Sequence, residues 1–201
     1  MTAILKVDTI QDTAGNNIIN ESSDTITIGA SGDTIALAGT TVTGITQGIT
    51  EADQWRLTTS FTGDAAPIAT NLERVDTSGW GKIGTGMSQS SGIFTFPSTG
   101  IWFVKFRVNN VYSGANLYSI GAIQVTTNNS SYANIASSEQ GITNAGVSVY
   151  SNTLSETLID CTNTSNVKVR FNVSVENNST TTVGDTNVSY TSMMFIRLGD
   201  T

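Results

Sequence analysis

The chain has 201 residues, a single cysteine, no histidine and a formal net charge of −7 at pH 7. The missing histidines exclude Ser-His-Asp and Cys-His catalytic groups, histidine zinc sites and the ordinary histidine pH switch. Nine basic residues are scattered among sixteen acidic ones, which argues against nucleic acid as a partner, because neutralising phosphates requires clustered Lys and Arg. Cys161 has no second cysteine to pair with, and we expect it to pack as a small buried hydrophobe.

No apolar run approaches the roughly 20 residues that a membrane-spanning helix needs. The first residues, Met1 to Asp8, contain no signal-peptide h-region. We therefore expect no membrane insertion, synthesis in a cytoplasm, and use outside the cell that makes the protein.

The chain divides into two parts of different composition. All fifteen aromatic residues lie at or after Trp55, whereas residues 1–54 are rich in Thr, Ile, Gly, Ala and Asp. A compact core normally uses aromatic side chains for bulk, so the first part is not expected to fold alone. We expect an N-terminal segment over residues 1–50 and a head domain over residues 51–201.

The N-terminal segment contains a short repeat, Asp24–Ala30 followed by Asp33–Gly39, in which isoleucines alternate with polar or small residues. Such short strands can bury their apolar faces when successive units stack or when chains wind together. A disordered arm is the alternative. The regular isoleucine alternation favours an intertwined or docked β segment.

The opening phrase, Ile4-Leu-Lys-Val-Asp-Thr-Ile-Gln-Asp-Thr-Ala-Gly-Asn16, resembles the N-terminal phrase of tail-fibre and other virion-appended proteins of tailed phages, particularly phages of marine bacteria. The resemblance implies a virion-attachment segment followed by glycine-threonine β repeats and an adhesive head. The apolar residues Leu5, Val7 and Ile10 are also typical of an edge strand that docks on another protein.

Residues from Trp55 onward contain strand-like runs between turn clusters, as in an all-β sandwich. The clearest is 101–111, where Trp102, Val104, Phe106 and Val108 alternate with charged residues. The final run, Tyr190–Leu198, is apolar on both faces, which is typical of a sandwich centre or a subunit contact. The expected strands are 55–61, 72–75, 82–87, 92–96, 101–111, 118–127, 145–150, 153–160, 167–175 and 189–198.

Residues 55–199 resemble the C1q/TNF superfamily in three landmarks. These are Gly92–Phe96 with Gly100–Phe106, then Leu154–Asp160 leading into Val167–Val175, and the apolar closing strand. The resemblance implies a ten-stranded jelly roll that forms a compact homotrimer, with adjoining N-terminal segments meeting on the threefold axis. The chain departs from the family pattern at Tyr190-Thr-Ser192, which lacks a glycine, and in the long loop expected at Tyr132–Ala145.

A homotrimer is also expected on physical grounds. The slender N-terminal repeat has no core of its own, and the doubly apolar final strand needs cover. A closed cyclic oligomer supplies both.

The sequence predicts no catalytic, cofactor-binding or metal-binding residue, and no cofactor. The carboxylates of the head form no recognisable motif and are interpreted as solvated loop charges. The family sometimes holds calcium near the trimer top, but the sequence locates no ligands for it. Gly79-Trp-Gly81 and Gly84-Thr-Gly86 precede no helix pattern, so they are interpreted as bends rather than phosphate loops. Trp80 is interpreted as a packed core or interface residue, with a sugar-stacking platform as the alternative.

The loops Thr126–Tyr132 and Glu176–Asp185 consist mostly of Asn, Ser, Thr and Gly. Short polar side chains on a rigid scaffold make adaptable hydrogen-bonding surfaces. These loops are candidates for binding host glycans or a receptor, and plain solubility explains their composition equally well.

Taken together, the sequence predicts a non-enzymatic, homotrimeric phage virion protein on the virion surface. Its N-terminal segment would attach it to other virion proteins, and its jelly-roll head would recognise the host surface as a tail-fibre-type adhesin. A capsid decoration or head-fibre protein is the closest alternative, because the N-terminal segment has little reach. A polysaccharide-degrading enzyme is the alternative of another class.

Overall fold

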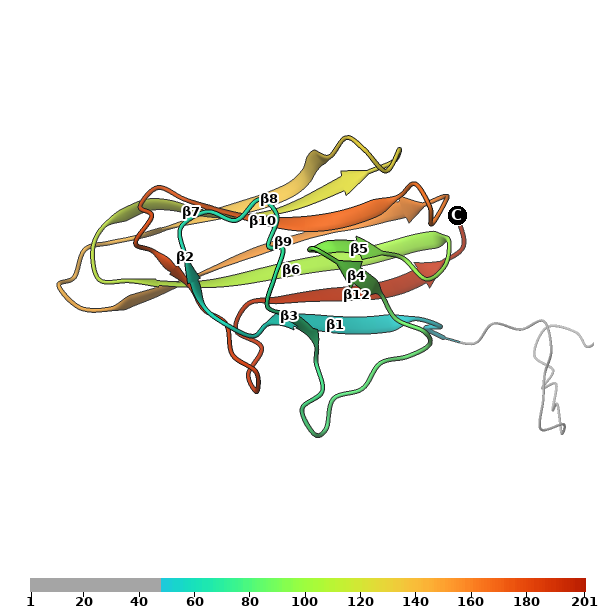
Figure 1. Ribbon diagram of the computed structural model, residues 1–201, viewed down its shortest axis with the longest axis horizontal. Helices are drawn as coiled ribbons and strands as arrows, with labels where there is room; N and C mark the ends of the chain where they lie inside the picture. Colours follow the sequence, from blue (N-terminus) through green and yellow to red (C-terminus); the bar gives the residue numbers. More distant parts are fainter. Residues whose placement is uncertain (1–47) are drawn as a thin grey trace, which may run out of the picture. The chain divides into compact units, whose positions relative to one another are not determined.

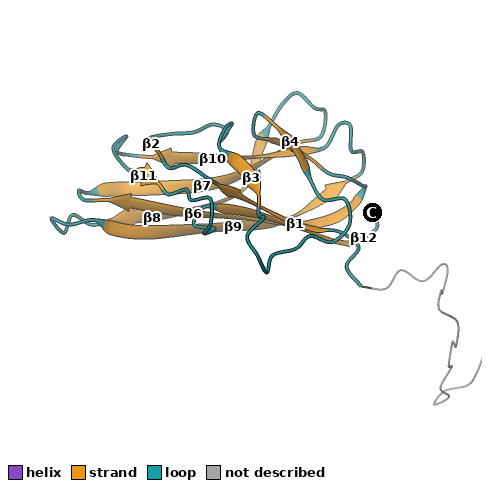
Figure 2. Ribbon diagram, turned by 60° about the horizontal axis from the view of Figure 1, so that its bottom comes forward, coloured by secondary structure: helices purple, strands orange, loops and turns teal. Residues whose placement is uncertain are grey.

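The computed structural model describes residues 48–201, and all regular structure in that range is β-strand (Figures 1 and 2). The expectations for residues 1–47, including the repeat and the attachment phrase, lie outside the described residues. The strands are β1 (Ala52–Leu57), β2 (Phe61–Thr62), β3 (Leu72–Arg74), β4 (Ser88–Ser90), β5 (Ile93–Thr95), β6 (Gly100–Tyr112), β7 (Asn116–Thr126), β8 (Ala133–Ile142), β9 (Val149–Cys161), β10 (Lys168–Val175), β11 (Thr181–Thr182) and β12 (Ser192–Gly199).

The strands form two antiparallel sheets that pack face to face. Sheet A has the order β2-β11-β6-β12-β1-β3, and β9 pairs with the other edge of β6. Sheet B has the order β4-β5-β10-β7-β8. This arrangement confirms the all-β jelly-roll sandwich. Ten of the described strands have three or more residues, and β2 and β11 add a two-residue pair beside β6.

The centre of sheet A is β6, which pairs with β9 over its whole length and with β12 from Ile101 to Arg107. Its inward side chains, Trp102, Val104, Phe106 and Val108, are fully buried, as the alternation predicts. A thirteen-residue strand with this strict period can bury one face only, so its register fixes which side chains reach the core.

An aromatic cluster joins the two sheets. Phe94 of sheet B contacts Trp55 and Phe195 of sheet A at ring-centroid distances of 5.4 and 5.2 Å. Phe171 lies 5.4 Å from Phe94 and 5.0 Å from Phe106. Edge-on and tilted contacts of this kind add to the free energy gained from burial alone.

The hairpin between β4 and β5 depends on backbone conformation. Ser91 and Gly92, its two turn residues, have φ angles of 50° and 77°. Two consecutive positive φ values are typical of a type I′ turn, whose twist matches that of the strands. A Cβ at Gly92 would also collide with the carbonyl oxygen of Ile68, so glycine is required there. The turn places Phe94 in the core.

Two of the predicted strands differ from the structure in position. Residues 82–87 form a loop that touches β1 through one bridge, Ala52 to Ile83, and the strand follows at β4. Gly84 and Gly86 have positive φ in this loop, which breaks an extended run. The run 55–61 is also shifted, because β1 is Ala52–Leu57 and Phe61 begins β2.

The region expected as a long loop, Tyr132–Ala145, instead contains β8, a ten-residue edge strand of sheet B. Most of its side chains are small or polar and exposed, so they gave no alternation signal. The run expected at 153–160 and the last two residues of the run expected at 145–150 belong to one continuous strand, β9 (Val149–Cys161), whereas residues 145–148 form a loop. Asn152 does not interrupt it, because the residue stays paired with Asn109 of β6.

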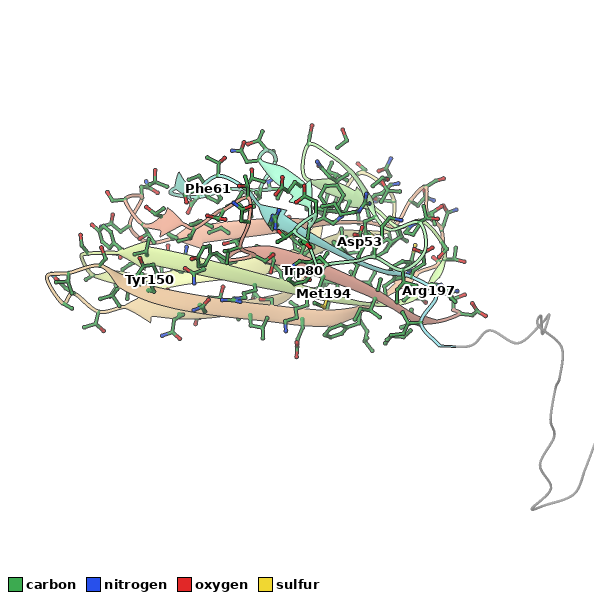
Figure 3. All side chains as sticks on the ribbon, turned by 90° about the horizontal axis from the view of Figure 1, so that it is seen from below. Asp53, Phe61, Trp80, Tyr150, Met194 and Arg197 are labelled. Atoms are coloured by element: carbon green, nitrogen blue, oxygen red, sulfur yellow. The ribbon has the colours of Figure 1, made fainter. Side chains whose placement is uncertain are left out.

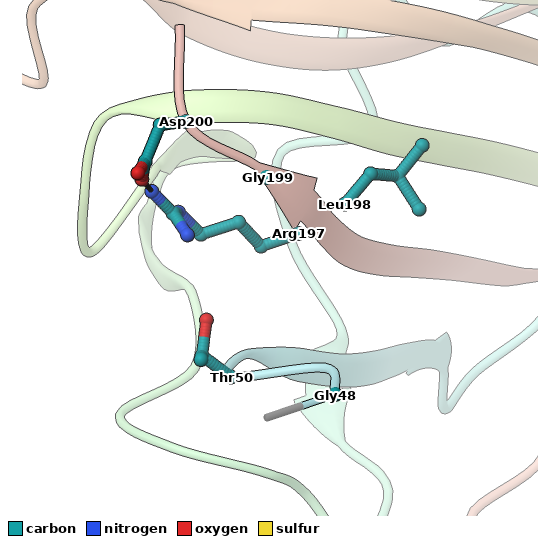
Figure 4. Close-up of a pocket in the computed structure, with 6 residues that line it drawn as sticks. All are labelled: Gly48, Thr50, Arg197, Leu198, Gly199 and Asp200. Atoms are coloured by element: carbon teal, nitrogen blue, oxygen red, sulfur yellow. Dashed lines mark hydrogen bonds and ion pairs between the residues drawn. The ribbon is translucent and has the colours of Figure 1, made fainter. Parts of the chain in front are cut away.

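The two ends of the sandwich differ in chemistry. At one end of sheet A, Gly100 pairs with Cys161, and Gly199 pairs with the next residue, Ile101. We call this end the base. The opposite end, where Tyr112 pairs with Val149, is the tip. Residue 48, where the described chain begins, lies at the base beside the last strand, and both line a small hollow there (Figure 4).

The interior becomes polar from base to tip. Along β9 the inward residues run Cys161, Ile159, Thr157, Ser155, Thr153 and Ser151. The inward face of β6 likewise ends in Asn110, whose amide donates to the Thr182 hydroxyl at 3.0 Å. The aromatic cluster therefore stabilises the base and centre, whereas hydroxyls and amides fill the tip.

The aromatic cluster generates a prediction about stability. Replacing Phe94 by Ala should lower the free energy of unfolding by about 3–5 kcal/mol, because it removes a fully buried ring and leaves a cavity between the sheets. Denaturant titration followed by tryptophan fluorescence measures the loss. Leu117→Ala, at a side chain that is 77% exposed, is the control and should change stability by no more than about 0.5 kcal/mol. Equal effects of the two substitutions would contradict the central role of Phe94.

Candidate interaction surfaces

The free face of sheet A, which points away from the core, carries a continuous apolar row. Paired positions across β1, β12, β6 and β9 place four apolar side chains side by side: Ala52, Ile196, Phe103 and Leu158. Leu158 is 59% exposed, and Phe103 and Ile196 are partly exposed. A run of apolar side chains across four strands on a solvent-facing sheet is typical of a protein contact surface.

Charged and apolar residues flank this row. On the tip side, Met194 pairs with Lys105, which in turn pairs with Glu156 on β9. One row further, Arg107 stands opposite Leu154, which is 46% exposed. Opposite charges directly across a strand pair attract one another. Figure 3 views this face, with Met194 near its middle.

The β8–β9 edge of the sandwich carries a second apolar surface, near the base. It is a hollow of about 270 Å³ lined mainly by apolar side chains of both sheets, Val125, Ile135, Leu158, Ile159 and Val167. Ile135 is 40% exposed. Leu158 belongs both to this edge hollow and to the apolar row, so the apolar surface continues around β9 from the face to the edge.

A buried carboxylate fixes the β3–β4 loop. Asp53, 3% exposed, accepts hydrogen bonds from the Trp55 indole at 2.9 Å, from the Met87 backbone N–H at 2.8 Å and from Arg74 at 2.9 Å. Glu51 accepts from the backbone N–H of Gly86 at 2.8 Å. Both acids lie at the start of the head, so the loop is held where β1 begins.

A second ion-pair group holds the other end of the same loop. The buried guanidinium of Arg56 contacts Glu73 at 2.6 Å and Asp76 at 2.7 Å, and it donates to the Thr77 hydroxyl at 2.7 Å. The loop between these two groups carries Trp80, which is 49% exposed. The described head therefore does not bury Trp80 in its core, and the interface and sugar-platform interpretations stay open.

The polar loops are held by their own side chains. Asn128 accepts from the backbone N–H groups of Ser130 and Ser131, and Asn177 accepts from that of Ser179. The backbone N–H groups of Asn187 and Val188 donate to Asp185 and lower the pKa of that carboxyl. Some of the Asn and Asp side chains thus order the loops themselves.

Two further titratable groups, Cys161 and Tyr132, have raised pKa values. Cys161 is fully buried, which confirms that it packs as a small hydrophobe, and burial raises the pKa of its thiol. Burial also raises the pKa of Tyr132, partly opposed by the Arg170 guanidinium, which lies 4.0 Å from the centroid of the Tyr132 ring.

Within residues 48–201, no cluster of three or more acidic or cysteine side chains is placed to hold a metal ion. The described range also contains no helix long and apolar enough to cross a membrane.

No protein-family model and no curated protein matches the sequence. Solved structures are similar to it in fold. The structure of Eiger TNF from S. frugiperda has a TM-score of 0.56 at 10% identity, over 75% of this chain and 93% of that one. Murine APRIL at pH 5.0 has a TM-score of 0.54 at 9% identity, over 74% of this chain and 98% of that one. The head is therefore a TNF-like jelly roll.

The buried carboxylate of Asp53 leads to a prediction about stability. Asp53→Asn should lower the free energy of unfolding by about 2 kcal/mol, because the buried carboxylate that accepts from Arg74, Trp55 and Met87 becomes a neutral amide with a single acceptor oxygen. Denaturant titration measures this loss. Asp200→Asn, which breaks the exposed pair with Arg197, is the matched control and should cost less than about 1 kcal/mol. A similar loss for both variants would show that the buried carboxylate contributes no more to stability than an exposed one.

Proposed function

We propose that the protein is a non-enzymatic, homotrimeric binding protein of a tailed-phage virion, attached through residues 1–50 and presenting the jelly-roll head to the host surface. The observation that carries the assembly is the pair of apolar surfaces on one head, the row on the free face of sheet A and the hollow at the β8–β9 edge. The TNF-like fold supports the same assembly, since such folds commonly form homotrimers.

The two surfaces differ in position, so one copy would offer its face to the edge of the next. A contact between unlike surfaces is heterologous. Such contacts form a closed ring when a whole number of copies, each rotated by the same angle, completes 360°. In a ring of three, Phe103 and Ile196 of each copy would pack beside Ile135 and Leu158 of its neighbour. Every copy would then have both apolar surfaces covered.

The virion assignment rests on the opening phrase Ile4–Asn16, which resembles tail-fibre and virion-appended proteins. The described chain begins at the base, so the tip is the end of the head farthest from residue 48 along β6 and β9. A head anchored in this way exposes the tip loops to a host surface. Three weak sites on one trimer would gain avidity against a repetitive surface.

The assembly is tested by light scattering coupled to size-exclusion chromatography at micromolar concentration. The unchanged protein should have three times the 21.1 kDa mass of one chain. Phe103→Glu should give a folded monomer, because it places a charge in the apolar row without touching the core. Leu117→Glu, at the exposed tip, is the control and should remain trimeric. A monodisperse monomer of the unchanged protein would refute the trimer.

The attachment role is tested in the virus. Deleting residues 1–45 should leave a folded, trimeric head that is missing from particles, because the attachment segment is gone. Electron cryomicroscopy of intact particles locates the unchanged chain. Density at the tail supports host recognition, whereas density on the capsid lattice assigns decoration of the shell. Particles that still carry the truncated head would contradict the anchoring role of residues 1–45.

The alternative of an enzyme has its own test. Loss of host polysaccharide on incubation with the pure protein would favour it.

A further inference from the structure

The β8–β9 edge has a second opening, at the tip. A hollow of about 450 Å³ lies between the end of β8 and the start of β9, where Gln140, Thr143, Tyr150 and Ser151 line it. A neighbouring hollow of about 580 Å³ shares Gln140 and Thr143 and extends to Leu117. We call the two hollows together the tip groove. Each falls within the range of roughly 300–1,000 Å³ that is common for ligand pockets.

The tip groove lies far from the apolar edge hollow. Tyr150 precedes Asp160, which lines the apolar hollow, by ten residues on the same strand, a separation of about 33 Å. Figure 3 places Tyr150 at the opposite end of the head from Arg197. The groove is thus at the end that the proposed attachment leaves facing outward.

The lining of the tip groove is uncharged throughout and mixes exposed apolar surface with hydrogen-bonding groups. Tyr150 is 65% exposed and Leu117 is 77% exposed. Amides and a hydroxyl from Gln140, Asn152 and Thr143 also line the hollow that contains Tyr150. An uncharged lining gives no basis for binding an ion, a phosphate or a charged peptide, because none of those would find a compensating charge.

The groove is also held in shape before any ligand arrives. The Asn152 side-chain oxygen accepts from the Asn109 amide at 3.1 Å and from Arg107 at 3.4 Å. These bonds fix the Asn152 side chain beside Tyr150. A lining that is ordered in advance loses less conformational entropy on binding.

We infer that the tip groove binds a neutral saccharide. A sugar ring presents an apolar C–H face, which packs on Tyr150, and hydroxyl edges, which pair with Asn152 and Gln140. Leu117 offers an apolar contact in the second hollow. The two hollows joined at Gln140 and Thr143 accommodate neighbouring units of an oligosaccharide. This inference rests on the proposed function for the outward direction of the tip, and it names the ligand class of that head.

The test uses the full-length protein on an array of neutral and acidic oligosaccharides, followed by calorimetric titration with the strongest neutral oligosaccharide. Tyr150→Ala should weaken binding about tenfold, because the ring contact with the sugar face is lost. Ala145→Trp, which fills the hollow from an exposed loop position, should abolish binding. Trp80→Ala removes an exposed aromatic ring elsewhere and is the control, with unchanged affinity expected.

Each outcome decides for or against the groove. Binding of a neutral oligosaccharide that is weakened by Tyr150→Ala and lost in Ala145→Trp, but kept in Trp80→Ala, supports it. No binding to any neutral oligosaccharide, preference for acidic ones, or dependence on Trp80 instead of Tyr150 overturns it. The result is separable from the proposed function, because light scattering and the location of the chain in particles test trimer and virion role without any sugar.

Discussion

The strict alternation of β6 is the constraint on which the rest of the head depends. The strand is paired with β9 along its whole length and with β12 and β11 on its other side. Its inward residues anchor the aromatic core, and its outward residues supply the centre of the free face. A shift of one residue would exchange the two faces, so core and candidate interface are set by the same register.

The parts of the fold that could be predicted are those where burial imposes a period on the sequence. β6 and β10 each bury one face completely, so their alternation was visible. β8 was missed because it is an edge strand whose inward positions include Ser138 and Gln140 rather than large apolar residues. The loop at 82–87 was mistaken for a strand because hydrogen bonds to Glu51 and Asp53 over thirty residues earlier hold it, and no local pattern reports such contacts.

The candidate surfaces were likewise predictable from the sequence only in part. The final strand was predicted to be apolar on both faces, and β12 indeed buries Met193 and Phe195 while Met194 and Ile196 stand on the free face. Phe103 was available as a signal, because it shares its face with Lys105 and Arg107 and is the aromatic exception there. The tip groove had no such signal. Its lining comes from the ends of β7, β8 and β9, and only the strand pairing brings those ends together.

The polarity of the interior changes along β9, from apolar side chains at the base to hydroxyls at the tip. Large apolar side chains at the base make the contacts that resist unfolding, and the apolar surfaces proposed for assembly lie at the same end. At the tip, backbone pairing and amide ladders such as Asn109 with Asn152 maintain the shape, while hydroxyls replace hydrocarbon in the interior. Replacing those hydroxyls would leave the aromatic cluster intact, but it would break buried hydrogen bonds such as those from Asn110 to Thr182 and from Ser155 to the Gly121 carbonyl.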